Sequence, residues 1–308
     1  MIAAEAPGLE LRLARPARYE LVRTLSPLRH GNGDPTIRLE TGRALRATRT
    51  PLGPATLEIR ESATELIVRS WGPGADWAVA QAPDLLGLND DPSALDALRP
   101  PHRLVVELAR RFGGIRLPRT GRVIEALVPA VLEQKISGEE ARQIYRALIR
   151  VHGESAPGPF GLRLQPTPER LAALPYHAYH PLGLERRRAE TLKRVGELAV
   201  RLETTAGLPL EAAHRRLGAV PGIGPWTVGE VARCALGDPD AVSVGDYHLP
   251  SLVAFALAGE RHADDARMLE ILEPYRGQRG RVVRLLEASG LGPARRGPRM
   301  VPHSIAGI

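Results

Sequence analysis

The 308-residue sequence contains a single cysteine, only two lysines and no long hydrophobic run. Because Cys234 has no second cysteine to pair with, an intramolecular disulfide is excluded, as are a cysteine-ligated iron–sulfur cluster and a structural cysteine zinc site. No apolar stretch approaches the about 20 residues that a membrane span needs. The first 21 residues carry several charges and no apolar segment, which is unlike a secretory signal. We therefore expect a cytoplasmic protein with no membrane partner.

The chain is basic, and nearly all of its positive charge comes from arginine. Its net charge is +7 and its pI is near 10.1, with Lys135 and Lys193 as the only lysines. A basic balance suits a polyanionic partner, since cationic side chains neutralise phosphates and release counterions. Abundant arginine, alanine, glycine and proline are also typical of a GC-rich genome, so the charge alone does not identify the partner.

The hydrophobic pattern changes from β-like to helical along the chain. Alternating or β-rich segments at 19–22, 36–40, 55–60 and 65–69 predict an antiparallel sheet with one covered side. From about residue 83 the spacing is helical and predicts roughly ten helices, with a linker at 157–168. The predicted fold is mainly α, with a small α+β N-terminal domain, and has a cleft between helical subdomains. The expected boundaries are residues 1–85 for the β-rich domain, 86–290 for the two helical subdomains and 291–308 for a basic, extended tail.

A glycine- and proline-rich turn joins the apolar-patterned segments at 210–217 and 226–236. Glycine lets a backbone approach a ligand closely, and consecutive N–H groups before a helix can face one anion. The N–H groups of Gly222, Gly224 and Thr227 would thus point at a phosphate oxygen. A plain turn between two helices remains the alternative for this motif alone.

The carbonyl groups of the same turn point the other way and could hold a monovalent cation, Na⁺ or K⁺, in a structural role. The carbonyls in question belong to Gly218, Val220 and Ile223. Beyond such an ion, no cofactor and no catalytic metal are expected.

One acidic residue, Asp246, lies twenty positions after Trp226. An apolar run at 241–244 precedes it, and the segment 247–257 is predicted to be a helix. An aspartate at that place is a favoured N-cap, and a capping carboxylate at the edge of a cleft is also held rigidly. A phosphate-binding turn followed by one fixed carboxylate indicates an enzyme that acts on a nucleotide within a nucleic acid.

The motif at 217–227 and its spacing to Asp246 resemble the helix–hairpin–helix base-excision DNA glycosylases. Within that superfamily the chain is most similar to the bacterial alkylation-repair branch, 3-methyladenine DNA glycosylase II. The residues at 182–190 resemble the start of a helix found in the family, and those at 132–137 stand where the family has its DNA-wedge segment. The small β-rich N-terminal domain also fits this branch.

The resemblance implies a monomer that flips a damaged, alkylated base out of double-stranded DNA and hydrolyses its N-glycosidic bond. It implies that Asp246 is the catalytic carboxylate and that Gln134 and Lys135 contact DNA. Bifunctional relatives carry a lysine nucleophile two positions after the second hairpin glycine, where this chain has Trp226. Base removal without strand cleavage is therefore expected, and Trp226 and Tyr247 are candidates for the wall of the base pocket.

Two residues depart from the family pattern. Lys135 stands where an apolar side chain would fill the gap left by the flipped base, and either phosphate contact or insertion of its alkyl stem fits a lysine there. Glu230 stands where the branch tends to have an aromatic pocket residue. A carboxylate there would favour a cationic base, accept from an exocyclic amine, or point to solvent.

Two alternatives to an alkylated-base glycosylase are open at this point. One is a glycosylase of the same fold that acts on an oxidised or deaminated base. The other is a non-catalytic protein that binds DNA structure through the hairpin. The presence of Asp246 at the expected spacing argues against the second alternative.

Overall fold

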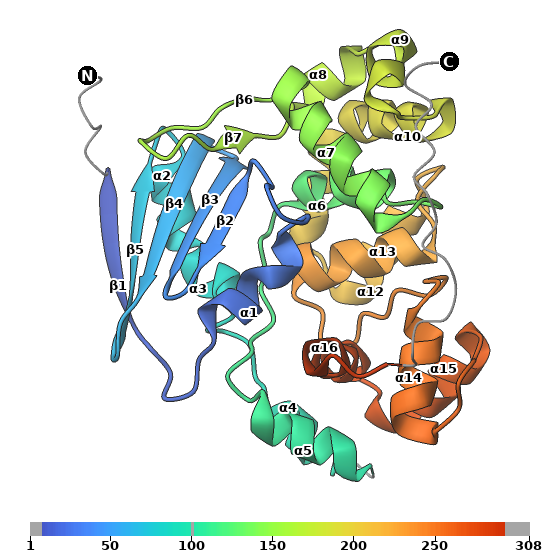
Figure 1. Ribbon diagram of the computed structural model, residues 1–308. Helices are drawn as coiled ribbons and strands as arrows, with labels where there is room; N and C mark the ends of the chain where they lie inside the picture. The colour runs from blue at the N-terminus through green and yellow to red at the C-terminus, as the bar shows by residue number, and fades with distance from the viewer. Residues whose placement is uncertain (1–7, 100–101, 293–308) are drawn as a thin grey trace.

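The computed structural model describes residues 8–99 and 102–292, in which an N-terminal antiparallel sheet packs beside a larger body of helices (Figure 1). The sheet has five strands in the order β1-β5-β4-β3-β2, with all neighbours antiparallel. The predicted mainly helical fold with a small N-terminal sheet is confirmed. The strands are β1 (Leu9–Ala14), β2 (Ile37–Glu40), β3 (Arg43–Thr50), β4 (Gly53–Glu61) and β5 (Glu65–Trp71).

The central strands β3 and β4 are covered on both faces, not on one as predicted. In β3, Ala44 belongs to a hydrophobic cluster with helices α2 (Ala75–Ala80) and α3 (Ala82–Leu85). Its neighbour Leu45 points to the other face and packs with Leu162 and Leu164. A covered second face explains why arginine and threonine side chains in β3 are also buried: they find partners in the helical body rather than in water.

Two local predictions are wrong. The segment at 19–22 is not a strand but leads into helix α1 (Leu21–Leu25), because Tyr19 and Leu21 pack under the sheet and the Tyr19 hydroxyl donates to the carbonyl of Leu86 at 2.9 Å. The linker at 157–168 instead belongs to a small hairpin of strands β6 (Glu154–Ser155) and β7 (Arg163–Leu164), which covers the second face of the sheet.

The helical body is built from more helices than the roughly ten predicted, and several of them have only four to six residues. Helix α13 continues directly into a π-helical turn at Ala232–Leu236. The helices of the body are α4 (Ser93–Ala97), α5 (Arg103–Arg111), α6 (Val123–Leu132), α7 (Gly138–His152), α8 (Pro168–Ala173), α9 (Tyr176–Tyr179), α10 (Arg186–Glu197), α11 (Ala199–Glu203), α12 (Leu210–Gly218), α13 (Pro225–Val231), α14 (Leu249–Ala258), α15 (Asp265–Leu272) and α16 (Arg279–Ser289).

Two hydrophobic clusters divide the helical body. The first contains buried residues between positions 123 and 241, including those of α6, α7, α10 and α13. The second joins residues 95–115 to residues 249–286, so α5 packs with α16 from the far end of the chain and shares a cluster with α14 and α15. The segment 237–248 passes from the first cluster to the second. The domain boundaries expected from the sequence stay a prediction.

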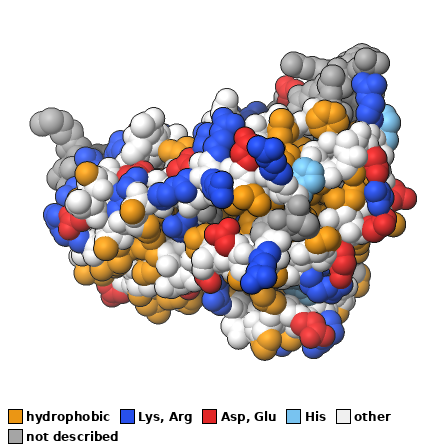
Figure 2. Space-filling model, turned by 90° about the horizontal axis from the view of Figure 1, so that it is seen from below, with side chains coloured by type: hydrophobic (Ala, Val, Ile, Leu, Met, Phe, Trp, Pro, Cys, Tyr) orange, Lys and Arg blue, Asp and Glu red, His pale blue; other side chains and the backbone are white. Residues whose placement is uncertain are grey.

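None of the helices within residues 8–99 and 102–292 is long and apolar enough to cross a membrane. Most of the predicted basic tail, residues 293–308, lies outside the described residues. On the face shown in Figure 2, lysine and arginine side chains are interspersed with aspartate and glutamate. Basic charge on this face is therefore mixed with acidic charge rather than gathered into a single patch.

Candidate active site

Asp246 lies in the irregular segment between the π-helical turn and α14, and its side chain is half-buried. Its Oδ1 atom accepts hydrogen bonds from the backbone N–H groups of His248 at 2.7 Å and Leu249 at 2.8 Å. Helix α14 thus begins at Leu249, two residues later than predicted, and His248 holds the N-cap position. The Asp246 carboxylate still satisfies backbone amides that a helix start leaves without partners.

The second carboxylate oxygen of Asp246 faces the hairpin helix. Its Oδ2 atom accepts a hydrogen bond from Nε1 of Trp226 at 3.2 Å. The preceding residue, Gly245, donates its N–H to Oδ1 of Asp265 at 3.0 Å. The structure therefore brings together two residues that are twenty positions apart in the sequence, and it fixes the backbone on both sides of the carboxylate.

The turn between α12 and α13 has the helix–hairpin–helix geometry. After Gly218 ends α12, the N–H of Val220 donates to Leu217 O at 3.1 Å, and the N–H of Ile223 donates to Val220 O at 2.9 Å. Of the three carbonyls expected to hold a cation, that of Val220 thus already accepts one bond. Gly218 stands at the end of a helix, where carbonyl groups lack helical partners.

The two glycines of the turn have different constraints. Gly222 has a φ of +95°, and a Cβ atom there would lie 2.4 Å from Oγ1 of Thr191. Gly224 has an extended conformation and open space around it. Among the described residues, none accepts a hydrogen bond from the N–H of Gly222 or of Gly224. Both amides are therefore available to a ligand.

The loop between α6 and α7 is tied to this turn. Nε2 of Gln134 donates to the carbonyl of Gly222 at 3.0 Å and lies 2.9 Å from Oγ1 of Thr227, which is buried. The next residue, Lys135, is exposed and has a φ of +58°. Left-handed backbone is uncommon for a residue with a side chain and is found often at functional sites. The predicted DNA-contact segment and the hairpin thus form one surface.

The predicted pocket residues Glu230 and Tyr247 lie in different environments. Tyr247 is 90 % exposed, with its ring edge-on to His248 at 4.9 Å between centroids. Glu230 lies one helical turn after Trp226 and lines a cavity of about 50 Å³. Tyr247 is not among the residues that line this cavity, and its role stays a prediction.

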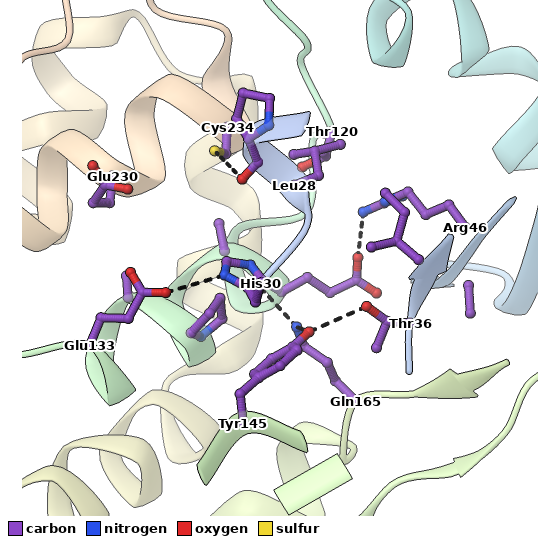
Figure 3. A pocket seen from close by; sticks show the side chains of 17 residues that line it. Leu28, His30, Thr36, Arg46, Thr120, Glu133, Tyr145, Gln165, Glu230 and Cys234 are labelled. Carbon is purple, nitrogen blue, oxygen red and sulfur yellow. Dashed lines mark hydrogen bonds and ion pairs between the residues drawn. The ribbon is translucent and has the colours of Figure 1, made fainter. Parts of the chain in front are cut away.

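The cavity lies where the segment before β2, the strand β3 and the helices α6, α7 and α13 meet (Figure 3). It combines apolar walls with several polar and ionisable side chains. Those labelled in Figure 3 are Leu28, His30, Thr36, Arg46, Thr120, Glu133, Tyr145, Gln165, Glu230 and Cys234.

Burial raises the pKa of Glu230, while the charge of Arg233 and a hydrogen bond from Ser243 partly oppose this shift. The Ser243 hydroxyl donates to Oε1 of Glu230 at 2.5 Å, and Nε of Arg233 lies 3.5 Å from Oε2. Burial also raises the pKa of the Cys234 thiol, which keeps that side chain neutral. At this wall of the cavity, burial thus works against the charged form of Glu230, while Arg233 and Ser243 work in its favour.

Sequence reasoning missed His30 and Tyr145, two lining residues of the cavity whose rings pack against each other. Nδ1 of His30 lies 3.3 Å from Oε1 of Glu133, and its ring centroid is 4.9 Å from that of Tyr145. The Tyr145 hydroxyl accepts from Nε2 of Gln165 at 3.1 Å, and burial raises its pKa well above the ordinary value. No local motif marks these residues, because they come from segments more than a hundred positions apart.

The whole fold resembles that of a solved 3-methyladenine DNA glycosylase from Archaeoglobus fulgidus, with a TM-score of 0.76 and 21 % identity. The match covers 90 % of this chain and 97 % of the other. The fold is thus similar to that of this DNA glycosylase, in agreement with the architecture that the sequence predicts. No protein-family model matches the chain.

Two curated proteins show sequence similarity over about half of the chain. One is DNA-3-methyladenine glycosylase 2 of Escherichia coli K12, 30 % identical over 165 residues, or 53 % of this chain and 57 % of that protein. The other is a probable bifunctional transcriptional activator/DNA repair enzyme AlkA of Mycobacterium tuberculosis H37Rv. It is 34 % identical over 178 residues, or 56 % of this chain. The match spans only 35 % of that longer relative. These names confirm the predicted resemblance to the alkylation-repair branch.

Proposed function

We propose that the chain is a monofunctional DNA glycosylase that removes an alkylated base from duplex DNA, acting as a monomer in base excision repair. The observation that carries this proposal is the Asp246 carboxylate, which accepts three hydrogen bonds beside a hairpin with two unpaired amides. Glu230, one turn further along α13 than Trp226, lines a cavity of about 50 Å³, and Asp246 is not among the residues that line it. The names of the two curated relatives support alkylated bases as the substrate class.

The geometry of Asp246 suits stabilisation of a positively charged sugar. A flipped nucleotide exposes its glycosidic bond, which lies out of reach inside the stack. As the C1′–N bond breaks, the base keeps the electron pair and the sugar becomes an oxocarbenium-like cation facing the carboxylate. Water then adds to C1′, and Asp246 takes its proton. A carboxylate has about four acceptor positions, of which three are used here, so one remains for the sugar and water.

The size of this effect follows from Coulomb's law. Unit charges about 4 Å apart attract by about 4 kcal/mol when the effective dielectric constant is about 20. Because each 1.36 kcal/mol changes a rate about tenfold, loss of the negative charge should slow the reaction about 1000-fold.

The hairpin amides of Gly222 and Gly224 would bind a DNA phosphate, together with the N–H of Thr227 at the start of α13. The backbone carbonyl oxygens of three residues in the same turn, Gly218, Val220 and Ile223, would hold a monovalent cation. Such an ion would supply positive charge next to the same phosphate. Phosphate contacts do not depend on the DNA sequence, so they would position the enzyme on the duplex without selecting the base.

The loop residue Lys135 would enter the gap that the flipped nucleotide leaves. Its exposed, left-handed position projects the side chain from the surface that Gln134 ties to the hairpin. The four-carbon stem would occupy the stack while the ammonium group remains near phosphate or a base edge.

Strand cleavage is not expected, because Trp226 stands where a lysine nucleophile would have to be. Its indole N–H is used to hold Asp246 rather than to attack the sugar. Treatment of the enzyme–DNA mixture with borohydride should therefore trap no covalent complex. The product strand should break only after hot alkali.

Comparison of the wild type with Asp246→Asn tests the proposal. With enzyme in excess over a duplex carrying one alkylated base, the variant should release base about 1000-fold more slowly. Its affinity for a duplex with a tetrahydrofuran abasic site should stay within a few-fold. Asp264→Asn is the matched control, because Asp264 also caps a helix, α15, by accepting from the N–H of Arg267 at 2.9 Å.

Three outcomes have distinct meanings. DNA binding without release of any base by the wild type would favour a non-catalytic binding protein. Release of an oxidised or deaminated base instead would support the same glycosylase reaction with a different lesion as substrate. Equal rates for the wild type and Asp246→Asn would refute the role of this carboxylate.

A further inference from the structure

Helix α10 contacts both of the segments that are predicted to bind DNA. In its first turn, Nη1 of the buried Arg188 donates to the carbonyl of Leu132 at 2.8 Å, at the end of α6 and shortly before Lys135. Further along α10, Thr191 lies against the hairpin between α12 and α13, since a Cβ atom on Gly222 would be 2.4 Å from its Oγ1. Side chains on α10 that face the hairpin are therefore placed to act on the same ligand as the hairpin.

Three of the five cationic side chains on α10 are neutralised by carboxylates of the same helix or of its N-cap residue. These ion pairs, at 3.0–3.9 Å, join Arg186 to Glu190, Arg188 to Glu185 and Lys193 to Glu197. The other two cations, Arg187 and Arg194, have no carboxylate partner within residues 8–99 and 102–292. Their positive charges are therefore not used by the fold.

The two arginines without a carboxylate lie on the face of α10 that contacts the hairpin. Arg187, Thr191 and Arg194 have the i, i+4, i+7 spacing of side chains that share one face of a helix. Nη1 of Arg194 donates to the carbonyl of Pro221 at 2.8 Å, directly before Gly222. A guanidinium has five N–H donors, so this bond leaves most of them for a ligand. Arg187 is exposed, and within the described part of the chain its guanidinium has no hydrogen-bond partner.

Unneutralised positive charge and unpaired amides thus occur side by side. The N–H groups of Gly222 and Gly224 lack an acceptor among the described residues, and the face of α10 with Arg187 and Arg194 adjoins them. The planar fork of an arginine matches the oxygens of a phosphate group. With a rise of 1.5 Å per residue, the backbones of the two arginines are about 10 Å apart along the helix, so each side chain reaches a different phosphate.

We propose that Arg187 and Arg194 extend the DNA-binding surface onto α10, where they bind phosphates that flank the one at the hairpin amides on the same strand. Arg194 also positions the hairpin through Pro221, whereas Arg187 acts on the DNA alone. This inference rests on the proposed function, because it takes the hairpin amides as a phosphate site. Since phosphates carry no sequence information, the two arginines strengthen binding to damaged and undamaged duplexes alike.

The test measures the affinity for a tetrahydrofuran duplex as a function of salt concentration. Each phosphate contact contributes about 0.9 to the slope of log K against log salt, so Arg187→Ala should reduce the slope by about 0.9. Between about 50 and 200 mM salt, the variant should therefore lose about 3.5-fold less affinity than the wild type. Arg186→Ala is the matched control, because Arg186 is also exposed on the first turn of α10 but pairs with Glu190. Its slope should equal that of the wild type.

Neutral phosphates identify the contact directly. Methylphosphonate at a phosphate bound by Arg187 should weaken binding of the wild type about fivefold, the effect of about 1 kcal/mol for two charges in water, and weaken binding of Arg187→Ala much less. An unchanged slope for Arg187→Ala, or the same reduction for Arg186→Ala, would overturn the inference. If the slopes change as expected but the wild type releases no alkylated base, the proposed function is refuted while the phosphate contact stands.

Discussion

The hydrogen bond between Trp226 and Asp246 gives a quantitative test of how the candidate active site is organised. Trp226→Phe removes the Nε1 donor, which lies 3.2 Å from Oδ2 of the carboxylate, and keeps an aromatic ring. The two backbone amides of His248 and Leu249 still hold Oδ1, so the carboxylate stays in place but gains freedom to rotate.

Trp226→Phe is expected to slow base release only modestly. A hydrogen bond to a charged group contributes about 1.5–3 kcal/mol, and 3.2 Å is at the long end of N–H···O distances, so the lower value applies. About 1.5 kcal/mol corresponds to roughly a tenfold slower release of an alkylated base. The assay is single-turnover base release with the enzyme in excess, so product dissociation does not enter the measured rate.

A double-mutant cycle separates positioning from packing. If the indole acts through Asp246, then Trp226→Phe should cost about tenfold in the wild type and little in the Asp246→Asn background. Affinity for an abasic duplex and the melting temperature of both single variants report on folding. If Trp226→Phe lowered the rate by the same factor in both backgrounds, the positioning role would be refuted and the tryptophan would act through packing or stacking.

Three further predictions concern the hairpin and the loop that carries the carboxylate. Gly222→Ala should lower the free energy of unfolding by about 2 kcal/mol in a denaturant titration, because φ is +95° and the new Cβ would meet Thr191. Gly224→Glu should leave the melting temperature unchanged, since the site is open, yet weaken binding to all duplexes about tenfold at low salt by facing phosphate with a negative charge. Asp240→Asn should cost about 2 kcal/mol at pH 7, because the carboxylate accepts from Gly277 N–H and from the Arg279 side chain. Burial raises the pKa of Asp240, but the hydrogen bonds from Arg279 lower it overall. The stability difference between the wild type and Asp240→Asn should therefore be complete above about pH 4 and decrease as the pH falls further. A constant difference down to about pH 2 would contradict this.

The sequence allows prediction of those parts of the site that are encoded locally. The hairpin glycines, Trp226 and Asp246 form a motif of fixed spacing, and the helices on either side have regular apolar patterns. Strands β4 and β5 were likewise predictable, since their apolar residues lie within short β-rich segments bounded by turn residues. Each of these features depends on residues close together in the chain.

Other features depend on contacts between distant segments. Strand β3 contains Arg46 and Thr48, which look solvent-exposed in the sequence but are buried because Glu125, more than seventy positions away, accepts from both. The cavity residues His30 and Tyr145 meet only because the sheet packs on the helical body. Hydrophobic periodicity carries no information on such pairs, so neither the second covered face of the sheet nor the cavity could be predicted.

The segment that carries Asp246 has no regular secondary structure, yet contacts at both of its ends fix it. At one end Asp240 bonds to the start of α16, and at the other Asp265 accepts from the N–H of Gly245. Within this segment, Ser243 and Asp246 bond to successive turns of α13. A loop is free to adopt backbone angles that a helix or strand does not allow, while hydrogen bonds to α13, α15 and α16 give this loop rigidity. Mutations in this segment should therefore change positioning of the carboxylate and the shape of the cavity together, because one set of contacts holds both.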